Sequence, residues 1–309
     1  MNQSAAYVLQ NLLNIVQLAC FYMPLAAAFA LIQAITRRVF LSFGDLAMFG
    51  SFAAVYICFG RLLQGDSDIT AALLSLAAAM ICAGALGQAS ARFIFAPLIK
   101  GSSLSFMIAA LGFSIAIEEV MRLTTDARDV WVPPLFTRQA ITLVSQPYPV
   151  KVTLSTLLAM SLSAVSLLAL GLLLKRTQFG RKWQACAQNE VLARLCGVNT
   201  PRVIELTFVL GAALAAVSGW TSAISYGGTN FFVGVMLGFK AMFAAVIGGF
   251  GSVRGAVVGA ACLAVLEVVW SANFGTAYRD AGVFGIIICV LLLKPEGLGG
   301  DATHRESEI

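Results

Sequence analysis

Long apolar stretches separated by short polar segments run along the whole chain. We expect nine of them, at residues 8–35, 40–60, 70–91, 102–122, 152–174, 203–225, 233–250, 255–272 and 280–294. Most approach the roughly 20 apolar residues that a helix needs to cross the hydrocarbon core of a bilayer. Their Leu, Ala and Val runs lack the alternation of a membrane barrel. The pattern predicts an all-α, polytopic bundle of about 8–10 transmembrane helices.

The composition supports a membrane protein. Apolar residues make up 59% of the 309 residues and charged residues 11%, against roughly 45–50% and about 25% in soluble domains. The first cation, Arg37, follows the first apolar run, so we interpret that run as a retained helix rather than a signal peptide. We expect one transmembrane domain over residues 1–300 and a polar cytoplasmic tail over 301–309.

Basic residues predict the orientation, because short cytoplasmic loops retain Lys and Arg. One set of loops carries thirteen: Arg37, Arg38, Arg92, Lys100, Lys175, Arg176, Arg181, Lys182, Arg194, Arg202, Arg254, Lys294 and Arg305. The other set carries six: Arg61, Arg122, Arg128, Arg138, Lys151 and Arg279. The first set is therefore expected in the cytoplasm, with the N-terminus outside and the C-terminus inside.

Two of the loops are long. Residues 123–151 are rich in proline and should form an extended external loop. Residues 175–202 should be cytoplasmic and include the sequence KWQACAQNEVLARLCGV, which is typical of a short amphipathic helix ending at Gly197. Leu192, Leu195 and Cys196 would share one face of it. An ordered helix of this kind suits a protein partner, whereas an ordinary solvated basic loop is the alternative.

Small residues recur at every fourth position in the C-terminal half. Gly211, Ala215 and Gly219 form one ladder, and Gly251, Gly255 and Gly259 form another. Such spacing lets helix backbones approach closely in lipid, so we expect these glycines, with Gly248 and Gly249, to be packing positions.

Known catalytic and ligand-binding patterns are not recognisable in the sequence. The run from Gly248 to Ser252 lacks the GK[ST] ending of a phosphate loop. The seven cysteines show no metal-binding spacing, and the single histidine, His304, lies in the polar tail. We therefore expect no catalytic residue, metal or cofactor in this chain, and a membrane enzyme is the weaker alternative.

Asp45, Lys240 and Glu267 are charges that fall within apolar segments, where charges are seldom idle. Asp45 follows Phe43 and Gly44, and we expect Gly44 to interrupt the run and Asp45 to cap a helix over about 46–60. The other interpretation is that these three residues line a translocation path. Lys240 and Glu267 are further candidate path residues. They should lie at similar depths in neighbouring antiparallel helices, so we expect either an ion pair or a Lys240 that faces the path independently.

Four stretches resemble a known family. They are FLSFGDLAMFGSFAA (40–54), FGRKWQACAQNEVLARLCGVNTPRVIELTFVLGAALAAVSGW (179–220), GFKAMFAAVIGGFGSVRGAVVGA (238–260) and AYRDAGVFGIIICVLLLKPEGLGG (277–300). They are similar to the permease subunits of branched-chain amino acid ABC importers, the LivH type. The family pattern NFAHG is altered here around Ser42 and Phe43, and Glu118 and Glu119 stand where the family has uncharged polar residues.

The resemblance implies a transport subunit of a bacterial inner membrane. Its partners would be a second homologous permease, two ABC ATPases that hold ATP and Mg, and a periplasmic substrate-binding protein, with no nucleic acid. The stretch 180–198 would be the coupling helix that contacts the ATPase. The matching positions are Gly180, Arg181, Ala185, Ala187, Leu195, Gly197 and Val198.

The resemblance leaves the substrate open, because similar permeases carry branched-chain amino acids, urea, amides or aromatic acids. Two other functional classes also stay open. They are a secondary transporter driven by an ion gradient and a structural membrane subunit of a larger enzyme.

Overall fold

The computed structural model describes residues 3–64, 67–99, 101–131, 141–144, 150–249 and 251–293. Its helices are α1 (Gln3–Thr36), α2 (Phe43–Leu63), α3 (Asp68–Ser90), the π-helical η1 (Ala91–Phe95), α4 (Ala96–Leu98), α5 (Ser103–Thr124), α6 (Leu154–Arg176), α7 (Gln178–Gln188), α8 (Glu190–Leu195), α9 (Thr200–Tyr226), α10 (Val233–Gly248), α11 (Val253–Phe274) and α12 (Arg279–Leu293). Four short strands, β1 (Val130–Trp131), β2 (Ile141–Val144), β3 (Val150–Val152) and β4 (Gly228–Thr229), join them.

The helical bundle agrees with the prediction, but the predicted segments do not all have spanning length. Within the described residues, seven helices are long and apolar enough to cross a membrane: Tyr7–Thr36, Phe43–Leu63, Asp68–Leu98, Ser103–Thr124, Leu154–Arg176, Thr200–Tyr226 and Val253–Phe274. The predicted seventh and ninth segments form α10, of 16 residues, and α12, of 15 residues. At 1.5 Å per residue these helices are about 24 and 22 Å long, shorter than a core of about 30 Å.

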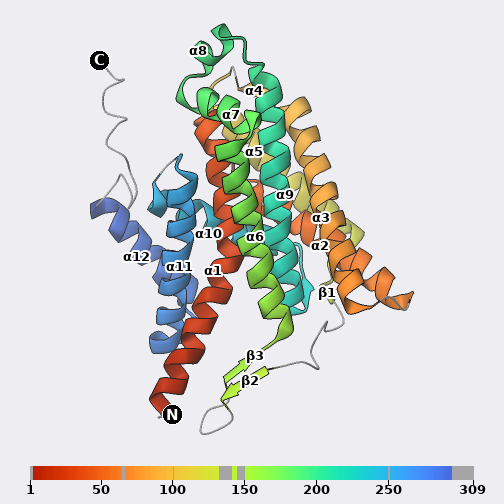
Figure 1. Ribbon diagram of the computed structural model, residues 1–309, viewed down its shortest axis with the longest axis vertical. Helices are drawn as coiled ribbons and strands as arrows, with labels where there is room; N and C mark the ends of the chain where they lie inside the picture. Colours follow the sequence, from red (N-terminus) through yellow and green to blue (C-terminus); the bar gives the residue numbers. More distant parts are fainter. Residues whose placement is uncertain are drawn as a thin grey trace.

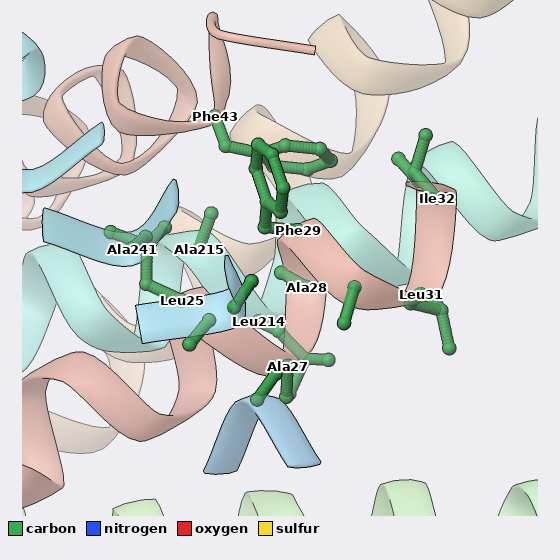
Figure 2. Packing of buried hydrophobic residues seen from close by; sticks show 14 of the residues in the cluster. Leu25, Ala27, Ala28, Phe29, Leu31, Ile32, Phe43, Leu214, Ala215 and Ala241 are labelled. Atoms are coloured by element: carbon green, nitrogen blue, oxygen red, sulfur yellow. The ribbon is translucent and has the colours of Figure 1, made fainter. Parts of the chain in front are cut away.

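Helix α1 lies inside the bundle and packs against α6, α9, α10 and α11 (Figure 1). Its residues from Leu25 to Ile32 are all 0–2% exposed. Figure 2 shows Leu25, Phe29 and Ile32 of α1 among Phe43 of α2 and Ala241 of α10. A helix that is apolar on every face can be buried on every face, and the C-terminal half of α1 follows that rule, whereas Tyr7, Val8, Leu12 and Val16 nearer its start are exposed. This buried half forms the core on which α6, α9, α10 and α11 pack.

The glycines of the two ladders that lie within helices are packing positions. A Cβ on Gly219 would overlap the Ala47 carbonyl of α2, and a Cβ on Gly259 would overlap the Ala244 carbonyl of α10. Gly248 and Gly255 face each other's backbone in the same way, and Gly211 receives the Phe43 ring. Two glycines were assigned wrongly: Gly249 (φ 98°) and Gly251 (φ 82°) form the turn between α10 and α11, where the left-handed backbone favours glycine.

The start of α2 also differs from the prediction. The helix begins at Phe43 with Ser42 in the N-cap position, so Asp45 lies in the first turn and is not the cap. Gly44 does not interrupt the helix. It lies where α2 crosses α10, because a Cβ there would overlap the backbone of Gly234 and Gly238. The resulting helix has 21 residues and is of spanning length, which the predicted range 46–60 was not.

The third segment continues past its predicted end at residue 91. A π-helical turn, η1, connects α3 to α4, and the continuous helical segment reaches Leu98. Pro97 follows this turn. Since proline has no backbone N–H to donate and crowds the preceding turn, a local widening of the helix accommodates it.

The short strands lie at the end of the bundle opposite α7 and α8 (Figure 1). β1 pairs with β4 in antiparallel register, with Val130 opposite Thr229 and Trp131 opposite Gly228. β2 pairs with β3, with Ile141 opposite Val152. The predicted loop 123–151 therefore contains some strand pairing, whereas its prolines and the predicted tail 301–309 lie outside the described residues.

Candidate functional site

A group of charged side chains is buried where α10 and α11 pack together. Lys240 Nζ lies 2.9 Å from Glu267 Oε1, and the two side chains are only 7% and 1% exposed. This distance is that of an ion pair. The angle between the two groups does not suit a hydrogen bond, so Glu267 Oε1 accepts none from the described residues. The predicted ion pair is therefore present, because the Gly249–Gly251 turn sends α11 back along α10 and brings both residues to one level.

Three further residues complete the charged group. Tyr22 of α1 donates its hydroxyl hydrogen to Glu267 Oε2 at 3.0 Å, and Lys240 donates to the Tyr22 oxygen at 3.2 Å. From the start of α12, Asp280 Oδ1 lies 3.1 Å from Lys240 Nζ, and Arg279 Nε lies 3.8 Å from Glu267 Oε2. Two cations and two anions thus form a group without net charge, which lowers the cost of placing each charge in the bundle.

Sequence reasoning found only two of these five residues. In the sequence Arg279 reads as an ordinary loop cation, and Asp280 and Tyr22 carry no local signal. Tyr22 lies 218 positions from Lys240 and 245 from Glu267. Only the tertiary packing of α1 and α12 on α10 and α11 brings these residues together. We call Tyr22, Lys240, Glu267, Arg279 and Asp280 the charge cluster.

Asp45 is a second buried carboxylate, separate from the charge cluster. Asp45 as a whole is 1% exposed. Ser114 of α5 donates to Asp45 Oδ2, whereas Oδ1 has no hydrogen-bond partner among the described residues. Ser42 donates to the Ala110 carbonyl at 2.6 Å, so both side chains connect α2 to α5. An incompletely satisfied carboxylate inside an apolar bundle is costly and is not explained by capping.

The predicted path residues all face other elements of this chain. Phe43 is 0% exposed and packs against Phe29 and Phe40. Asp45, Lys240 and Glu267 are buried as described above. Nothing in this arrangement tests whether they line a translocation path, and that role stays a prediction. No group of three or more His, Cys, Asp or Glu side chains that could hold a metal occurs within the described part of the chain.

The basic loop 175–202 folds into two helices rather than the single one predicted. Asn189 separates α7 from α8, with φ −155° and ψ 109°. Its side chain accepts hydrogen bonds from the amides of Val191 and Leu192 at 3.0 and 3.1 Å, which is the bonding of an N-cap. The second helix begins at Glu190 for that reason, although the apolar spacing of the whole stretch is compatible with one helix.

The end of α8 agrees with the prediction. Gly197 has φ +81°, its amide donates to the Arg194 carbonyl, and the Val198 amide donates to the Ala193 carbonyl, both at 3.0 Å. This pair of bonds is a Schellman motif, in which glycine takes the left-handed position. Gly180 is required at the other end of the segment, because a Cβ there would overlap the Leu174 carbonyl at the turn between α6 and α7.

The two helices of this loop differ in exposure. On α7, Trp183 and Cys186 are buried, and Ala185 and Ala187 are half-buried against the core. Burial raises the pKa of the Cys186 thiol, and the negative charge of Glu190 adds to the effect. On α8, Val191, Leu192 and Leu195 are 68%, 58% and 79% exposed. We call these three residues the α8 apolar face.

Two arginines after α1 hold this end of the bundle together. Arg37 donates to the Gln188 carbonyl at the end of α7 at 2.8 Å. Arg38 donates to four carbonyls after α3, those of Leu98, Ile99, Gly101 and Ser102, at 2.7–3.1 Å. Carbonyls at helix ends lack partners within the helix, and a guanidinium with five donors can satisfy several of them. Both arginines therefore position the loops rather than only marking a boundary.

These features define a multi-pass helical membrane protein with an ordered pair of helices outside its spanning segments. The family described as branched-chain amino acid transport system / permease component matches residues 11–292. The chain belongs to this family.

Curated relatives align with it almost from end to end. The high-affinity branched-chain amino acid transport system permease protein LivH of Salmonella typhimurium is 34% identical, over 97% of this chain and 98% of that protein. LivH of Escherichia coli K12 is 33% identical over the same shares, and BraD of Pseudomonas aeruginosa is 32% identical over 95% and 96%. A solved chain of PsaBC from Streptococcus pneumoniae matches with a TM-score of 0.48 at 16% identity, covering 93% of this chain and 92% of that one, which is too low to define a shared fold.

Proposed function

We propose that this chain is the membrane-spanning permease subunit of an ABC importer that moves branched-chain amino acids inward. The observation that carries the proposal is the match to permease relatives of that description over 97% of the chain. The match leaves no large part of this chain free for a separate activity. ATP and Mg would be held by partner ATPase subunits, and this chain would hydrolyse nothing itself.

The orientation follows from the basic loops. The end with α7 and α8 carries Arg37, Arg38, Lys175 and Arg181, and the positive-inside rule places it in the cytoplasm. The N-terminus is then external, and the described chain at Leu293 lies near the cytoplasmic side. The paired strands β1 and β4 face outward, where a periplasmic binding protein delivers substrate.

The α8 apolar face is the proposed contact with an ATPase subunit. It lies outside the helices long enough to span a membrane, and the described part of this chain leaves Val191, Leu192 and Leu195 exposed. Exposed apolar groups gathered on one short helix are typical of a protein contact. The hydrogen bond from Arg37 to Gln188 ties this segment to α1, so a displacement of α7 and α8 reaches the core helix directly.

The contact supports a mechanism in which the chain's own helices move as packed units. The glycine crossings join α2 to α9 and α10 to α11 at backbone distance, and such pairs move together rather than slide. The charge cluster links α1, α10, α11 and α12. A second, homologous permease would supply the opposite wall of the path, as the relationship to importer permeases implies.

Uptake by cells tests the proposal. A strain without this gene should take up labelled leucine more slowly than the parent, and a plasmid copy should restore the rate. Unlabelled isoleucine and valine should compete, whereas urea, acetamide and phenylalanine should not. Competition by one of the latter three, with none by isoleucine, would reassign the substrate class while retaining the transporter class. An unchanged rate for all of these solutes in the deletion strain would contradict the proposal.

A further inference from the structure

A groove of about 630 Å³ opens at the end of the bundle that carries α7, between α6 on one side and the start of α11 on the other. Figure 1 shows α1 between these two helices. The wall of the groove along α6 is apolar and includes Leu167, Leu168 and Leu174, and Val257 continues it on α11. The groove is therefore a slot on the side of spanning helices, next to the place where they leave the membrane.

Gly171 makes this wall open. It lies between the leucines of α6, and a Cβ added there would meet nothing within 4 Å. The space in front of α6 is thus available to something other than this chain. An acyl chain is the apolar group that surrounds a spanning helix everywhere in a bilayer.

The upper end of the same groove is positively charged. Lys175 lies in the last turn of α6 and Arg254 in the first turn of α11, and both side chains are exposed and line the groove. The amides of the first turn of α11 add partial positive charge; within the described residues a side-chain cap is present for the Gly255 amide, from Ser252. No acidic side chain is among the described residues that line the groove.

A buried donor completes this polar end. Trp183 of α7 lines the groove and is 7% exposed, yet its indole Nε1 has no hydrogen-bond partner in the part of the chain that the structure describes. A buried N–H without an acceptor is costly. Because this atom is itself covered, a ligand oxygen in the groove would satisfy it only after a shift of the neighbouring side chains. The groove thus offers two cations and a donor at one end and an apolar slot at the other.

We propose that this groove binds one anionic phospholipid. Its phosphate would lie between Lys175 and Arg254 and accept a hydrogen bond from Trp183, and one acyl chain would lie along the α6 wall over Gly171. Free phosphate fits only the polar end and leaves the leucine wall uncovered. A zwitterionic lipid fits the wall but brings its own cation to a site that already has two. The occupant would join α6 to α11, which pack on opposite sides of α1.

Native mass spectrometry of the full chain in detergent, titrated with phosphatidylglycerol, tests the proposal. The unmodified chain should retain one phosphatidylglycerol and prefer it to phosphatidylcholine by at least about tenfold. The double variant Lys175→Gln/Arg254→Gln should weaken retention by about twenty-fivefold, because each basic residue near an anionic headgroup contributes about fivefold. Trp183→Phe, which keeps the packing and removes the donor, should weaken it by a few fold.

A matched pair of glycine variants tests the apolar slot. Gly171→Trp fills the space along α6 and should abolish retention of the lipid. Gly112→Trp places the same side chain on α5, where a Cβ would also meet nothing within 4 Å, and should leave retention unchanged. A monodisperse profile for both variants shows that each is folded, so loss of the lipid from Gly171→Trp alone supports the site.

Several results would overturn the proposal. They are equal retention of phosphatidylcholine, unchanged retention in the double variant and in Gly171→Trp, or displacement of the lipid by inorganic phosphate alone. A Gly171→Cys chain in native membranes gives a further check with a bifunctional thiol reagent. A crosslink to another protein subunit would show that a protein covers the groove, and the lipid site would then be rejected.

Discussion

Lys240 of α10 and Glu267 of α11 form a buried ion pair, with 2.9 Å between Nζ and Oε1 and side chains that are 7% and 1% exposed. Each has a second partner of opposite charge on α12, since Asp280 faces Lys240 and Arg279 faces Glu267. Tyr22 of α1 contacts both members of the central pair. The pair is therefore the centre of a polar connection among α1, α10, α11 and α12.

Removal of one member of this pair should destabilise the protein. Glu267→Gln leaves the buried Lys240 with Asp280 as its only anion, so we expect a loss of about 3 kcal/mol, near the lower end for a broken buried pair. Thermal unfolding of the purified chain in detergent measures the change. The exposed pair of Glu119 and Arg122 provides the control, because Glu119→Gln breaks a contact between side chains 47% and 44% exposed and should have little effect.

The charge-swapped double variant Lys240→Glu/Glu267→Lys should recover part of that loss, because the net charge of the cluster is restored. The recovery should be incomplete, since Asp280 then faces a carboxylate and Arg279 an ammonium. Single variants as stable as the unmodified chain would show that the pair does not hold these helices together.

Asp45 is expected to have a functional carboxylate. Asp45→Asn keeps an acceptor for the Ser114 hydroxyl and removes a charge whose second oxygen is unpaired, so the variant should be at least as stable as the unmodified chain. Uptake of labelled leucine should nevertheless fall by about tenfold or more, because a charge retained in an apolar bundle at such a cost serves the transported substrate or the movement. Full uptake by a normally folded Asp45→Asn protein would exclude a needed charge.

Leu195→Asp should weaken the proposed contact between the α8 apolar face and the ATPase. Leu195 is 79% exposed on the α8 apolar face, so the change should leave the bundle folded. In the assembled transporter it should lower substrate-stimulated ATP hydrolysis and uptake together. Ala187→Asp is less selective, because Ala187 packs against the core and its replacement also disturbs the fold. Normal coupling in a stable Leu195→Asp transporter would reject the α8 apolar face as the ATPase contact.

Cysteine labelling tests the proposed orientation. Cys196 is exposed next to the α8 apolar face, whereas Cys186 is buried in α7. Burial raises the pKa of the Cys186 thiol, so less thiolate is available near neutral pH and its reaction with a maleimide should be slow. In a chain that keeps only these two cysteines, a membrane-impermeant maleimide should label Cys196 in inside-out vesicles and not in intact spheroplasts. The reverse pattern would invert the topology.

The sequence allowed the Lys240–Glu267 pair to be predicted because both charges interrupt apolar helices that a short glycine turn connects. Lys240 and Glu267 lie at similar distances along two antiparallel helices, so they are expected to be close together whatever the rest of the fold. Tyr22 and Asp280 could not be predicted in this way, since their contact with the pair depends on how α1 and α12 pack. The same limit applies to Ser114, whose link to Asp45 depends on where α5 lies against α2.

Errors at helix boundaries came from signals of similar strength that lie close together. Ser42 and Asp45 can both begin a helix, and the close crossing of Gly44 with α10 requires α2 to be formed already at Gly44. Asn189 is a good N-cap residue, but the apolar spacing around it also fits an unbroken helix. Tertiary contacts decided these cases: Gly234 and Gly238 at α2, and Arg37 at the end of α7.

ATP-dependent uptake into proteoliposomes tests the central claim most directly. The chain is reconstituted with its partner permease, both ATPase subunits and the binding protein, and labelled leucine inside the vesicles is counted. We predict accumulation that requires ATP, Mg and the binding protein, and that persists when proton and sodium gradients are collapsed. Accumulation by this chain alone, driven by an ion gradient and indifferent to ATP, would contradict the account.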